Sequence, residues 1–542
     1  MPGPKKSSSA LPPLVRAMKR PGFYSHAPED VTLIQTHISW VFLAGGLVYK
    51  VKKPVTLPFL DFSTLALRKT FCDLELRLNK RLAPETYQEV VPVFARGKAF
   101  TLSPCGEPVE YAVVMKRLPE EGMFTRMLAE GRLLRRHMEL TASLLCSFHA
   151  AADTNGTVDL IGRIGFIGRN HTENFTSTEK YAGAITSRAQ HGFLWGFGDR
   201  FLREHAGLFA SRVKNHRIRD CHGDLHLGNI CLDGERLVIF DCIEFSRHFR
   251  YEDVAAEVAF LAMDLEFNGA FELSRSFSDT YVKMSADSDI LPLLRFYKFY
   301  RACVRAKVHC IRSSDPSVAR AERREAETLA ARYLDLAASY AARPEKPCLF
   351  AVMGLSGSGK SSVARELARL TGASLLQSDV IRKEIFRVPR TERRLDDYGQ
   401  GLYNPRATER TYAELFSRAE ALLARNTSVI LDATFLQSVH RETAFSLGRK
   451  FGADFYGAWC SCPEDETRRR LESRTSQKDE PSDGRFETYL KQKELWEPPR
   501  QIYAHRIFAL DTMGPPRDLA FTALARFFGG KGPGTACPAT EC

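Results

Sequence analysis

Three polar residues near the middle of the chain have the types and the spacing of a phosphoryl-transfer site. Asp224 lies five residues before Asn229 in the segment His222–Asn229, and Asp241 ends the apolar run that follows. Such a site needs a base that orients a hydroxyl group and at least two oxygen ligands for magnesium. Asp224, on a tight glycine-containing loop, suits the first task, whereas Asn229 and Asp241 suit the second. The segment therefore predicts a transfer of phosphate from Mg-ATP to a hydroxyl group.

A second phosphate-binding pattern lies further along the chain. The segment Gly354–Ser361 has the complete Gly-x4-Gly-Lys-Ser spacing of a P-loop, and it stands between an apolar run and a helical pattern. The glycines let consecutive backbone N–H groups surround a phosphate, and the N-terminus of the following helix adds positive charge. Lys360 is expected to bridge the β and γ phosphates, and the Ser361 hydroxyl is expected to hold magnesium. The residues that we expect to bind this nucleotide are Gly354, Ser356, Gly357, Ser358, Gly359, Lys360, Ser361 and Ser362.

Two acidic residues and an arginine follow this P-loop in the sequence. Asp379 and Arg382 are three residues apart at the start of a predicted helix, so they share one of its faces. Asp379 could take a proton from an acceptor hydroxyl while Arg382 holds the acceptor. The alternative is that Asp379 caps the helix and Arg382 is a solvated surface residue. Asp432 ends another apolar strand-like run, as a Walker B residue does, and we expect it to support magnesium.

A further arginine pair follows in the segment Arg468–Arg474. Arg470 and Arg474 are four residues apart on a predicted helix. A lid that closes over ATP commonly brings arginines to the transferring phosphoryl group, where positive charge stabilises the transition state. A solvated charged face is an equally good interpretation of the same pattern.

The first motif resembles the catalytic core of the aminoglycoside phosphotransferase family, a branch of the protein-kinase-like fold. The resemblance rests on His-Gly-Asp-x-His-x-x-Asn and on the Phe-Asp-Cys-Ile-Glu segment, and it covers roughly residues 30–315. It implies that Asp224 is the catalytic base and that Asn229 and Asp241 hold magnesium. Asp253, before an apolar helix, is expected to anchor the catalytic loop.

The same resemblance implies a lysine that contacts the α and β phosphates of ATP. Lys50 has the expected place on a strand, Lys52 shares its strand face, and Glu75 in the following helix is the expected ion-pair partner. Residues 113–118 would form the strand and hinge beside adenine. No Gly-x-Gly-x-x-Gly precedes the lysine strand, which departs from protein kinases and argues against a protein substrate.

Residues 348–530 resemble the P-loop kinase group that includes gluconate kinase, the kinase domain of polynucleotide kinase and zeta toxins. The pair Asp379 and Arg382 looks most like the acceptor-site pair of polynucleotide kinases. The whole arrangement is similar to a bacterial bifunctional fusion family, in which an aminoglycoside phosphotransferase-like domain precedes a P-loop kinase or AAA-type ATP-binding domain.

The elements that must position these residues divide the chain into two folded parts. A length of 542 residues predicts two or three domains. We expect a two-lobed kinase-like α+β domain over 26–343, with a small lobe over about 30–118 and a helical lobe over about 119–343. The proline-bearing stretch at 343–347 is the predicted boundary. A three-layer α/β/α P-loop domain is expected over 344–528, and residues 1–25 and 529–542 are expected to be disordered.

Composition limits the remaining possibilities. Hydrophobic residues make up 44% and charged residues 26%, no apolar run is long enough for a membrane span, and the N-terminus lacks a secretory signal. We therefore expect a cytoplasmic protein. The 13 cysteines are scattered, which indicates reduced thiols and no zinc site. The net charge of +12 is spread along the chain, so nucleic acid is a less favoured partner. The pattern says nothing about oligomeric state.

These observations predict a bifunctional ATP-dependent phosphotransferase. Each domain would transfer the γ-phosphoryl group of Mg-ATP to a hydroxyl acceptor, most plausibly a small metabolite or sugar. One alternative is a nucleotide-sensing regulatory ATPase. Another is a P-loop domain of the zeta-toxin or polynucleotide 5′-kinase type that the N-terminal domain controls.

Overall fold

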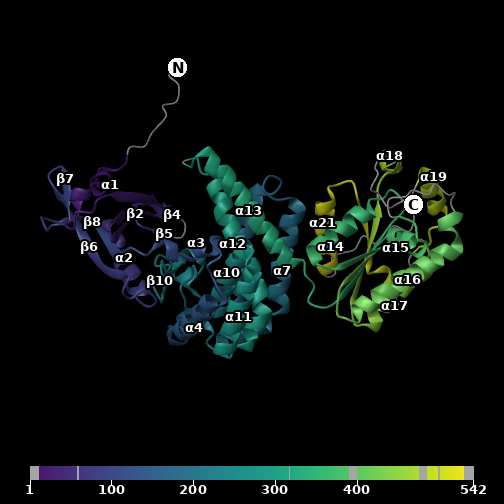
Figure 1. Cartoon of the computed structure of the whole chain (residues 1–542), viewed down its shortest axis with the longest axis horizontal. Coiled ribbons are helices and arrows are strands. Elements are labelled where there is room, and N and C mark those ends of the chain that lie inside the picture. Colours follow the sequence, from purple (N-terminus) through teal and green to yellow (C-terminus); the bar gives the residue numbers. More distant parts are fainter. Residues whose placement is uncertain are drawn as a thin grey trace, which may run out of the picture. The chain divides into compact units, whose positions relative to one another are not determined.

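The computed structural model describes residues 11–57, 60–316, 318–389, 399–474, 485–498 and 501–529 (Figure 1). The chain forms two compact units. Unit 1 comprises Met1–Arg169 and His205–Arg301, and unit 2 comprises Asn170–Glu204 and Ala302–Cys542. Each unit contains one of the two motifs, because Asp224 lies in unit 1 and Lys360 lies in unit 2.

An antiparallel sheet with the strand order β1-β2-β3-β8-β6-β7 forms the small lobe of unit 1. The strands are β1 (Val31–Gln35), β2 (Ser39–Ala44), β3 (Leu47–Lys52), β6 (Tyr87–Arg96), β7 (Ala99–Thr101) and β8 (Pro108–Lys116), beside the short pair β4 (Thr56–Leu57) and β5 (Leu60–Asp61). Helix α2 (Leu65–Asn79), capped by the Thr64 side chain, packs against β6 and β8. Because Lys50 and Lys52 alternate with buried Val51 on the central strand β3, both face α2.

The N-terminal segment differs from our expectation. Residues 11–25 are ordered: α1 (Pro13–Met18) and the 3-10 turn η1 (Pro21–Phe23) cover the sheet. Val15 and Met18 are buried in the cluster that contains Tyr49, and the Tyr24 hydroxyl donates to Met18 O at 2.6 Å. The expectation of disorder is therefore wrong for this stretch, because its few apolar residues share one helix face. Residues 1–10 and 530–542 lie outside the described residues.

The helical lobe of unit 1 holds the segment with Asp224 and Asn229 between short strand pairs. β10 (Ile230–Asp233) and β11 (Arg236–Ile239) form a hairpin, and β9 (Ile218–Asp220) pairs with β12 (Tyr251–Asp253). Helix α10 (Val254–Phe267) is buried on almost every side and lies beneath these strands. The other elements are η2 (Glu120–Gly122), α3 (Phe124–Ala129), α4 (Arg135–Ala151), α5 (Gly156–Ile161), α8 (Ala206–Lys214), η4 (Leu227–Asn229), α9 (Arg247–Arg250), α11 (Phe271–Ser285) and η5 (Ser288–Ile290).

A parallel sheet with the order β14-β15-β13-β16-β17 forms the centre of unit 2. Its strands are β13 (Cys348–Met353), β14 (Ser374–Gln377), β15 (Val429–Asp432), β16 (Asp454–Ser461) and β17 (Ile507–Asp511). The helices that follow them are α14 (Lys360–Thr371), α15 (Ser378–Ile385), η6 (Gly401–Tyr403), α16 (Pro405–Leu423), α17 (Ser438–Lys450), α18 (Glu464–Arg474), α19 (Phe486–Glu494), α20 (Gln501–Ala504) and α21 (Pro516–Phe528). Helices α14 and α21 cover one face of the sheet, and α16 and α17 cover the other (Figure 1). The predicted fold class is confirmed.

Unit 2 extends beyond the P-loop sheet to helices that precede it in the sequence. These include η3 (Glu179–Tyr181), α7 (Arg188–Glu204) and α13 (Arg320–Ala341). The remaining helices that the structure describes are α6 (Ile164–Thr178) and α12 (Leu291–Ser313). The ring of Phe193 on α7 lies 5.6 Å from that of Phe521 on α21, and Arg517 forms an ion pair with Asp335 on α13. The unit around the P-loop is therefore larger than the 344–528 domain that we expected, and the boundary at 343–347 stays a prediction.

Candidate active sites

The loop between β9 and η4 holds Asp224 in a fixed conformation. Gly223 has φ 87°, and a Cβ there would lie 2.8 Å from the Phe249 carbonyl oxygen, so only glycine fits. The Asn229 side chain turns back to the same loop and donates to Asp224 O at 3.0 Å. The Asp224 side chain remains 37% exposed. The loop therefore presents a carboxylate that a substrate can reach.

A buried glutamate on α10, which the sequence did not single out, anchors this loop. Glu257 accepts hydrogen bonds from the backbone N–H groups of His222 at 2.8 Å and Gly223 at 2.7 Å. Burial alone would raise the pKa of Glu257, but the hydrogen bond with His149 and the loop N–H groups outweigh it and lower the pKa. A charged residue inside an otherwise apolar helix was the available signal. Asp253, which we expected to have a structural role here, pairs with Arg212 at 2.7 Å and accepts a hydrogen bond from the Ala255 N–H at the start of α10; its contribution to the loop stays a prediction.

His149, Cys221 and Glu257 offer three ligand-type atoms in one buried place. Both ring nitrogens of His149 are already engaged, Nε2 with Glu257 and Nδ1 with the Tyr281 hydroxyl, each at 2.7 Å. A metal ion there would have to displace both contacts. The cluster is therefore better explained as support for the catalytic loop.

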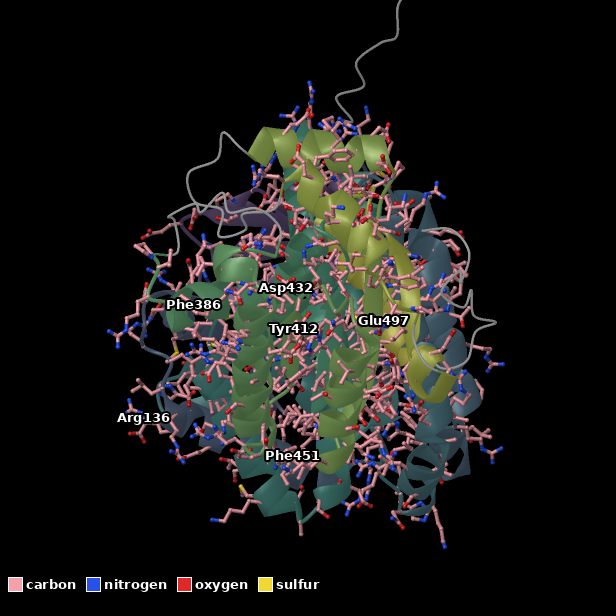
Figure 2. The ribbon with its side chains drawn as sticks, turned by 90° about the vertical axis from the view of Figure 1, so that its right-hand side faces the viewer. Arg136, Phe386, Tyr412, Asp432, Phe451 and Glu497 are labelled. Carbon is pink, nitrogen blue, oxygen red and sulfur yellow. The ribbon has the colours of Figure 1, made fainter. Side chains whose placement is uncertain are left out.

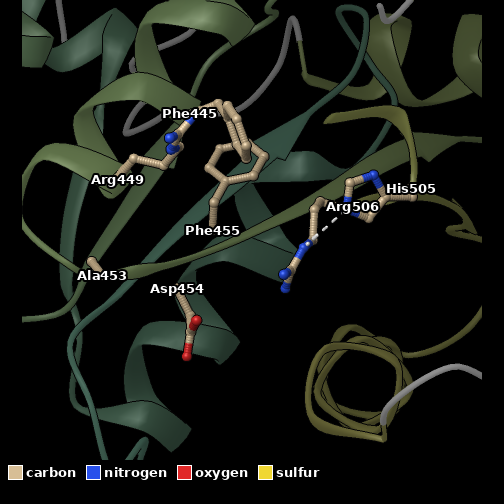
Figure 3. A pocket seen from close by; sticks show the side chains of 7 residues that line it. All are labelled: Phe445, Arg449, Ala453, Asp454, Phe455, His505 and Arg506. Atoms are coloured by element: carbon tan, nitrogen blue, oxygen red, sulfur yellow. Dashed lines mark hydrogen bonds between the residues drawn. The ribbon is translucent and has the colours of Figure 1, made fainter. Parts of the chain in front are cut away.

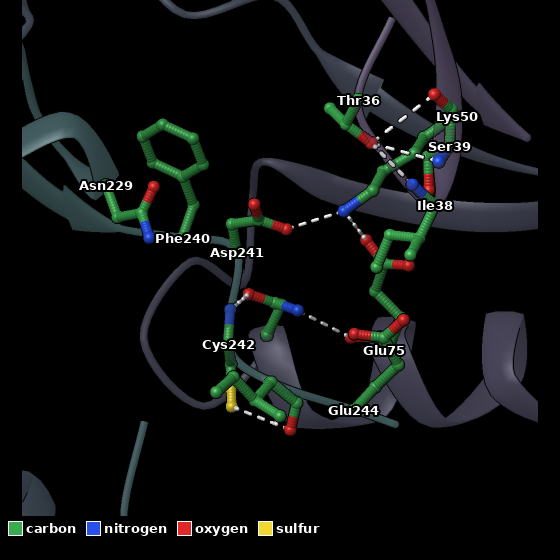
Figure 4. Close-up of polar contacts among 12 residues, drawn as sticks. Thr36, Ile38, Ser39, Lys50, Glu75, Asn229, Phe240, Asp241, Cys242 and Glu244 are labelled. Carbon is green, nitrogen blue, oxygen red and sulfur yellow. Dashed lines mark hydrogen bonds and ion pairs between the residues drawn. The ribbon is translucent and has the colours of Figure 1, made fainter. Parts of the chain in front are cut away.

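Lys50, Glu75 and Asp241 lie close together in unit 1 (Figure 4). Lys50 Nζ lies 2.7 Å from Glu75 Oε1 and 2.5 Å from Asp241 Oδ1. Burial would raise the pKa of Glu75, but the charges of Lys50 and Lys52 hold it at about 2. The structure thus brings together three residues that lie far apart in the sequence, and it gives each a partner of opposite charge.

Asp241 has an unusual backbone conformation that its neighbours maintain. Its φ is 65°, in the left-handed region that few residues other than glycine adopt. Its N–H donates to the Tyr87 hydroxyl at 3.2 Å, and the next N–H, of Cys242, donates to Asn79 Oδ1 at 2.8 Å. These contacts from β6 and α2 turn the Asp241 side chain toward Lys50. Together with Asn229 it offers hard oxygen donors, which fit magnesium.

In unit 2, the P-loop joins β13 to α14 as the sequence predicts. Gly354, Gly357 and Gly359 have φ values of 144°, 80° and 82°. A Cβ on Gly354 would lie 2.4 Å from Cys460 O, which excludes any larger residue. The Lys360 side chain is buried, with Nζ 3.5 Å from Leu355 O. The loop is therefore preformed around the first turn of α14.

Asp432 lies at the end of β15 beside this loop. Gln377 donates to its Oδ2 at 2.9 Å, whereas Oδ1 is buried and lacks a hydrogen-bond partner among the described residues. Burial raises the pKa of Asp432 despite the attraction of Lys360. The Ser358 hydroxyl is likewise buried without a partner in that part of the chain. Unsatisfied oxygens of this kind fit a hydrated magnesium ion and a phosphate group, because buried polar atoms normally have partners.

The turn after Asp432 is supported from α16 (Figure 2). The Tyr412 hydroxyl accepts from the Phe435 N–H at 2.9 Å, and the Tyr412 ring stacks on His440 with centroids 3.7 Å apart. Phe435 has φ 51°, which is rare for a bulky residue. The tyrosine therefore fixes the chain direction directly after the Walker B position.

Asp379 and Arg382 lie within α15, and the helix is capped one residue before Ser378 at Gln377. Asp379 is therefore not the N-cap. Arg382 is 6% exposed, donates to Leu402 O at 2.8 Å and lies 4.7 Å over the Tyr403 ring. The alternative of a capping aspartate and a solvated arginine is wrong on both counts, although the catalytic roles of the pair stay predictions.

Arg470 lies against the P-loop. Its guanidinium donates to Thr512 O at 2.8 Å and to Glu466 at 2.6 Å, and a Cβ on Gly359 would lie 3.0 Å from it. Thr512 also donates to Ser358 O at 2.7 Å, so this residue, which the sequence did not mark, ties the loop to the end of β17. Arg470 is thus not part of a solvated face. The side chain of Arg474 lies outside the described residues.

A separate surface pocket of about 420 Å³ lies at the other end of the sheet (Figure 3). Its lining includes Asp454 at the start of β16 and His505 and Arg506 before β17. Parallel strands place their carboxyl ends, and with them the P-loop and Asp432, at the opposite edge. The pocket is therefore not part of the nucleotide site.

Comparisons with known proteins agree with this division. Residues 64–294 match the phosphotransferase enzyme family, and residues 349–499 match the AAA domain family. Uncharacterised proteins of Mycobacterium tuberculosis and Mycobacterium bovis are each 34% identical over 435 residues, which is 78% of this chain and 81% of the relative.

Among solved structures, the chain is similar to a gluconokinase from Sinorhizobium meliloti, with 21% identity over 34% of this chain and 93% of that one, and a TM-score of 0.25. It is also similar to a choline/ethanolamine kinase family protein from Mesorhizobium loti, with 12% identity over 60% of this chain and 99% of that one, and a TM-score of 0.35. At these scores neither likeness supports an inference about substrate.

Within the part of the chain that the structure describes, no helix combines the length and apolarity needed to cross a bilayer. The two family matches confirm the predicted fusion, and the kinase families to which they point use ATP. The chain belongs to the same family as the mycobacterial proteins, and it is a kinase-type, ATP-dependent phosphotransferase in which a phosphotransferase-family domain precedes a P-loop domain.

Proposed function

We propose that the chain carries two separate Mg-ATP-dependent phosphotransferase sites, each of which acts on the hydroxyl group of a small molecule. The observation that supports this proposal is that each unit brings together residues of its own predicted phosphate site. In unit 1 these are Lys50, Glu75 and Asp241, which form one ion-paired group. In unit 2 they are Lys360 and Asp432 at the P-loop.

In the first site, Asp224 would orient the acceptor hydroxyl and accept its proton. Lys50 would contact the nucleotide phosphates, and Glu75 would hold Lys50 in place. Asn229 and Asp241 supply oxygen donors that would hold magnesium, which neutralises charge on the phosphates when it is bound. Because Asp241 pairs with Lys50 in the structure, nucleotide and metal binding would replace one ion pair by two new contacts.

In the second site, the preformed loop of residues 354–361 would surround the phosphates with backbone N–H groups. Lys360 would neutralise the transferring phosphoryl group, and Ser361 and Asp432 would hold magnesium or its water. Arg470, held against Gly359, lies near enough to the loop to counter charge that develops in the transition state. Arg474 is the second arginine that we propose for this role.

The acceptor side of the second site favours a small molecule. Asp379 is in the first turn of α15 and would serve as the base, with Arg382 as the residue that positions the acceptor. Arg382 is enclosed by Leu402 and the Tyr403 ring, and its Nε lacks a hydrogen-bond partner among the described residues. An enclosed cation suits a compact polar acceptor better than a nucleic-acid 5′ end.

The full-length chain tests this proposal directly. ATP consumption would be measured against a library of sugars and other hydroxyl metabolites for the parent chain, Asp224→Asn and Asp379→Asn. We expect each variant to abolish transfer to a different acceptor. Asp279→Asn is the matched control, because this aspartate is 67% exposed on α11, and it should leave both activities unchanged. Loss of the same single activity in both site variants would contradict two independent sites.

A further inference from the structure

A second lysine lies beside the first in the small lobe, and it has different surroundings. Lys52 is completely buried, whereas the Lys50 side chain is 12% exposed. Lys52 Nζ lies 2.7 Å from Glu75 Oε2 and contacts Glu244, and it lies 4.9 Å over the Phe62 ring. No atom of a bound nucleotide could reach an ammonium group that is enclosed in this way.

The two lysines share one carboxylate. Glu75 uses Oε1 for Lys50 and Oε2 for Lys52, so both of its oxygens are occupied by cations. Glu244 then binds the far side of Lys52, three residues after Asp241 in the chain. The ion pairs therefore form a continuous series from Asp241 through Lys50, Glu75 and Lys52 to Glu244.

Side chains at the end of α2 and just after it reinforce this series by binding backbone groups of the other lobe. Asn79, one turn after Glu75, accepts from the Cys242 N–H at 2.8 Å. Arg81, just beyond the helix, donates to the carbonyl oxygens of Asp220 at 2.8 Å and Cys221 at 3.0 Å. The helix that carries Glu75 is thus bound to the catalytic segments on both sides of Asp224.

We propose that Lys52 is a positioning residue of the first site: together with Glu244 it fixes Glu75, so that Lys50 is held ready for the nucleotide phosphates before ATP binds. This inference rests on the proposed function of the first site. Glu75 alone could rotate about its side-chain bonds, and Lys50 could then follow Asp241 away from the phosphate position. With Lys52 and Glu244 in place, only one arrangement pairs all five charged groups of the series.

An ATP acyl-phosphate probe, which acylates lysines that lie at the phosphates of bound nucleotide, separates the roles of the two lysines. In the full-length parent chain we expect labelling of Lys50 and of Lys360, each suppressed by excess Mg-ATP, and no labelling of Lys52. In the double variant Lys52→Met/Glu244→Gln we expect the labelling rate of Lys50 to fall about tenfold, while that of Lys360 stays within about twofold. Lys360 thus serves as an internal control for the probe and for the second unit.

A matched control is available in the same lobe. Arg68 on α2 donates to both oxygens of Glu110 on β8 at 2.9 Å, and this pair is buried but does not touch Lys50 or Glu75. Arg68→Met/Glu110→Gln therefore removes a buried ion pair of similar burial, and Lys50 labelling should stay within about twofold of the parent. If the double variant at Lys52 and Glu244 does not fold, Glu244→Asp carries the test, with an expected loss of about threefold.

The outcomes distinguish this inference from the proposed function. Parent-level labelling of Lys50 in the folded Lys52 and Glu244 variant would overturn the inference and leave the site intact. Labelling of Lys52 in the parent would overturn it by reversing the roles of the lysines. Absence of labelling at both lysines in the parent would remove the proposed function of the first site, and the inference with it.

Discussion

Lys50 Nζ lies 2.5 Å from Asp241 Oδ1, so the residue that we expect to hold the nucleotide phosphates contacts the residue that we expect to hold magnesium. The two come from the small lobe and from the end of β11, and their ion pair joins both parts of the first site. Mg-ATP binding would separate them, since each then acquires a ligand of its own.

Asp241→Asn should therefore impair the first site far more than it impairs folding. We expect kcat/KM for the first acceptor to fall at least about a hundredfold, equivalent to roughly 2.7 kcal/mol, with the magnesium requirement raised. Asp279→Asn is the control, because this aspartate is 67% exposed on α11 and belongs to neither proposed site. Equal losses in the two variants, measured by initial rates across a magnesium series, would contradict a metal-binding role.

Gly354→Ala should prevent nucleotide binding by the second site. Its Cβ would lie 2.4 Å from Cys460 O, so the loop has to move. Gly372→Ala is the matched control: φ is 72° there as well, but a Cβ meets nothing within 4 Å. We expect it to cost about 1 kcal/mol of stability and to leave binding intact. Calorimetric titration with Mg-ATP measures nucleotide binding by the two glycine variants, in a chain whose first site also carries Asp241→Asn. Tight binding of Mg-ATP by Gly354→Ala would refute the prediction.

Glu257→Ala should loosen the catalytic loop of the first site. Two backbone N–H groups, of His222 and Gly223, would lose their acceptor inside the protein. Each unsatisfied buried donor costs about 1–3 kcal/mol, so we expect unit 1 to lose at least that much stability and the first activity to fall. Thermal unfolding and initial rates check this, with exposed Glu272→Ala on α11 as the control. An unchanged first activity would show that the loop keeps its conformation without this anchor.

His309 should make unit 2 sensitive to acid. Burial, with help from Arg305 and Arg312, lowers its pKa from 6.5 to about 4. Because the unfolded chain binds the proton more readily, the stabilisation is complete above pH 6.5 and is lost as the pH falls toward 4. This loss follows the difference in proton binding between the unfolded and the folded chain.

His309→Phe tests this dependence, because it keeps a ring stacked on Tyr333 and removes the titrating group. Denaturant unfolding of the parent and the variant at neutral and acidic pH measures the difference. We expect the variant to lose less stability on acidification than the parent does. Equal losses would mean that other groups dominate the acid response of this unit.

Phe521→Ala should destabilise unit 2 strongly, since this ring is fully buried and packs against Phe193 on α7. Removal of such a ring typically costs about 3–5 kcal/mol. Phe271→Ala is the control, because that ring is 59% exposed, and it should change stability by less than about 1 kcal/mol. Similar thermal shifts in both variants would argue against α7 as a support of the P-loop unit.

Local spacing in the sequence predicted the chemistry that we propose for both sites. Asp224 and Asn229 share one loop, and Gly354 to Ser361 form one turn, so neighbouring residues alone specify which groups can meet a phosphate. The strand that carries Lys50 and the helix that carries Glu75 were also predictable, because their apolar periodicity and breakers are local. The prediction for residues 11–25 was wrong, because their burial depends on a sheet whose strands come later in the sequence.

Only the tertiary structure decided which distant residues complete these sites. Thr512 carries no local signal that separates it from ordinary polar residues, and the local signals at Glu257 and Glu244 do not reveal their partners, which come from other elements. The same holds for Lys50 and Lys52, which look equivalent on one strand face until Asp241 and Glu244 approach from the other lobe. Spacing along the chain is a property of the sequence, whereas burial and charge pairing are properties of the packed molecule. Lys50 and Lys52 differ only in their burial and in their charged partners.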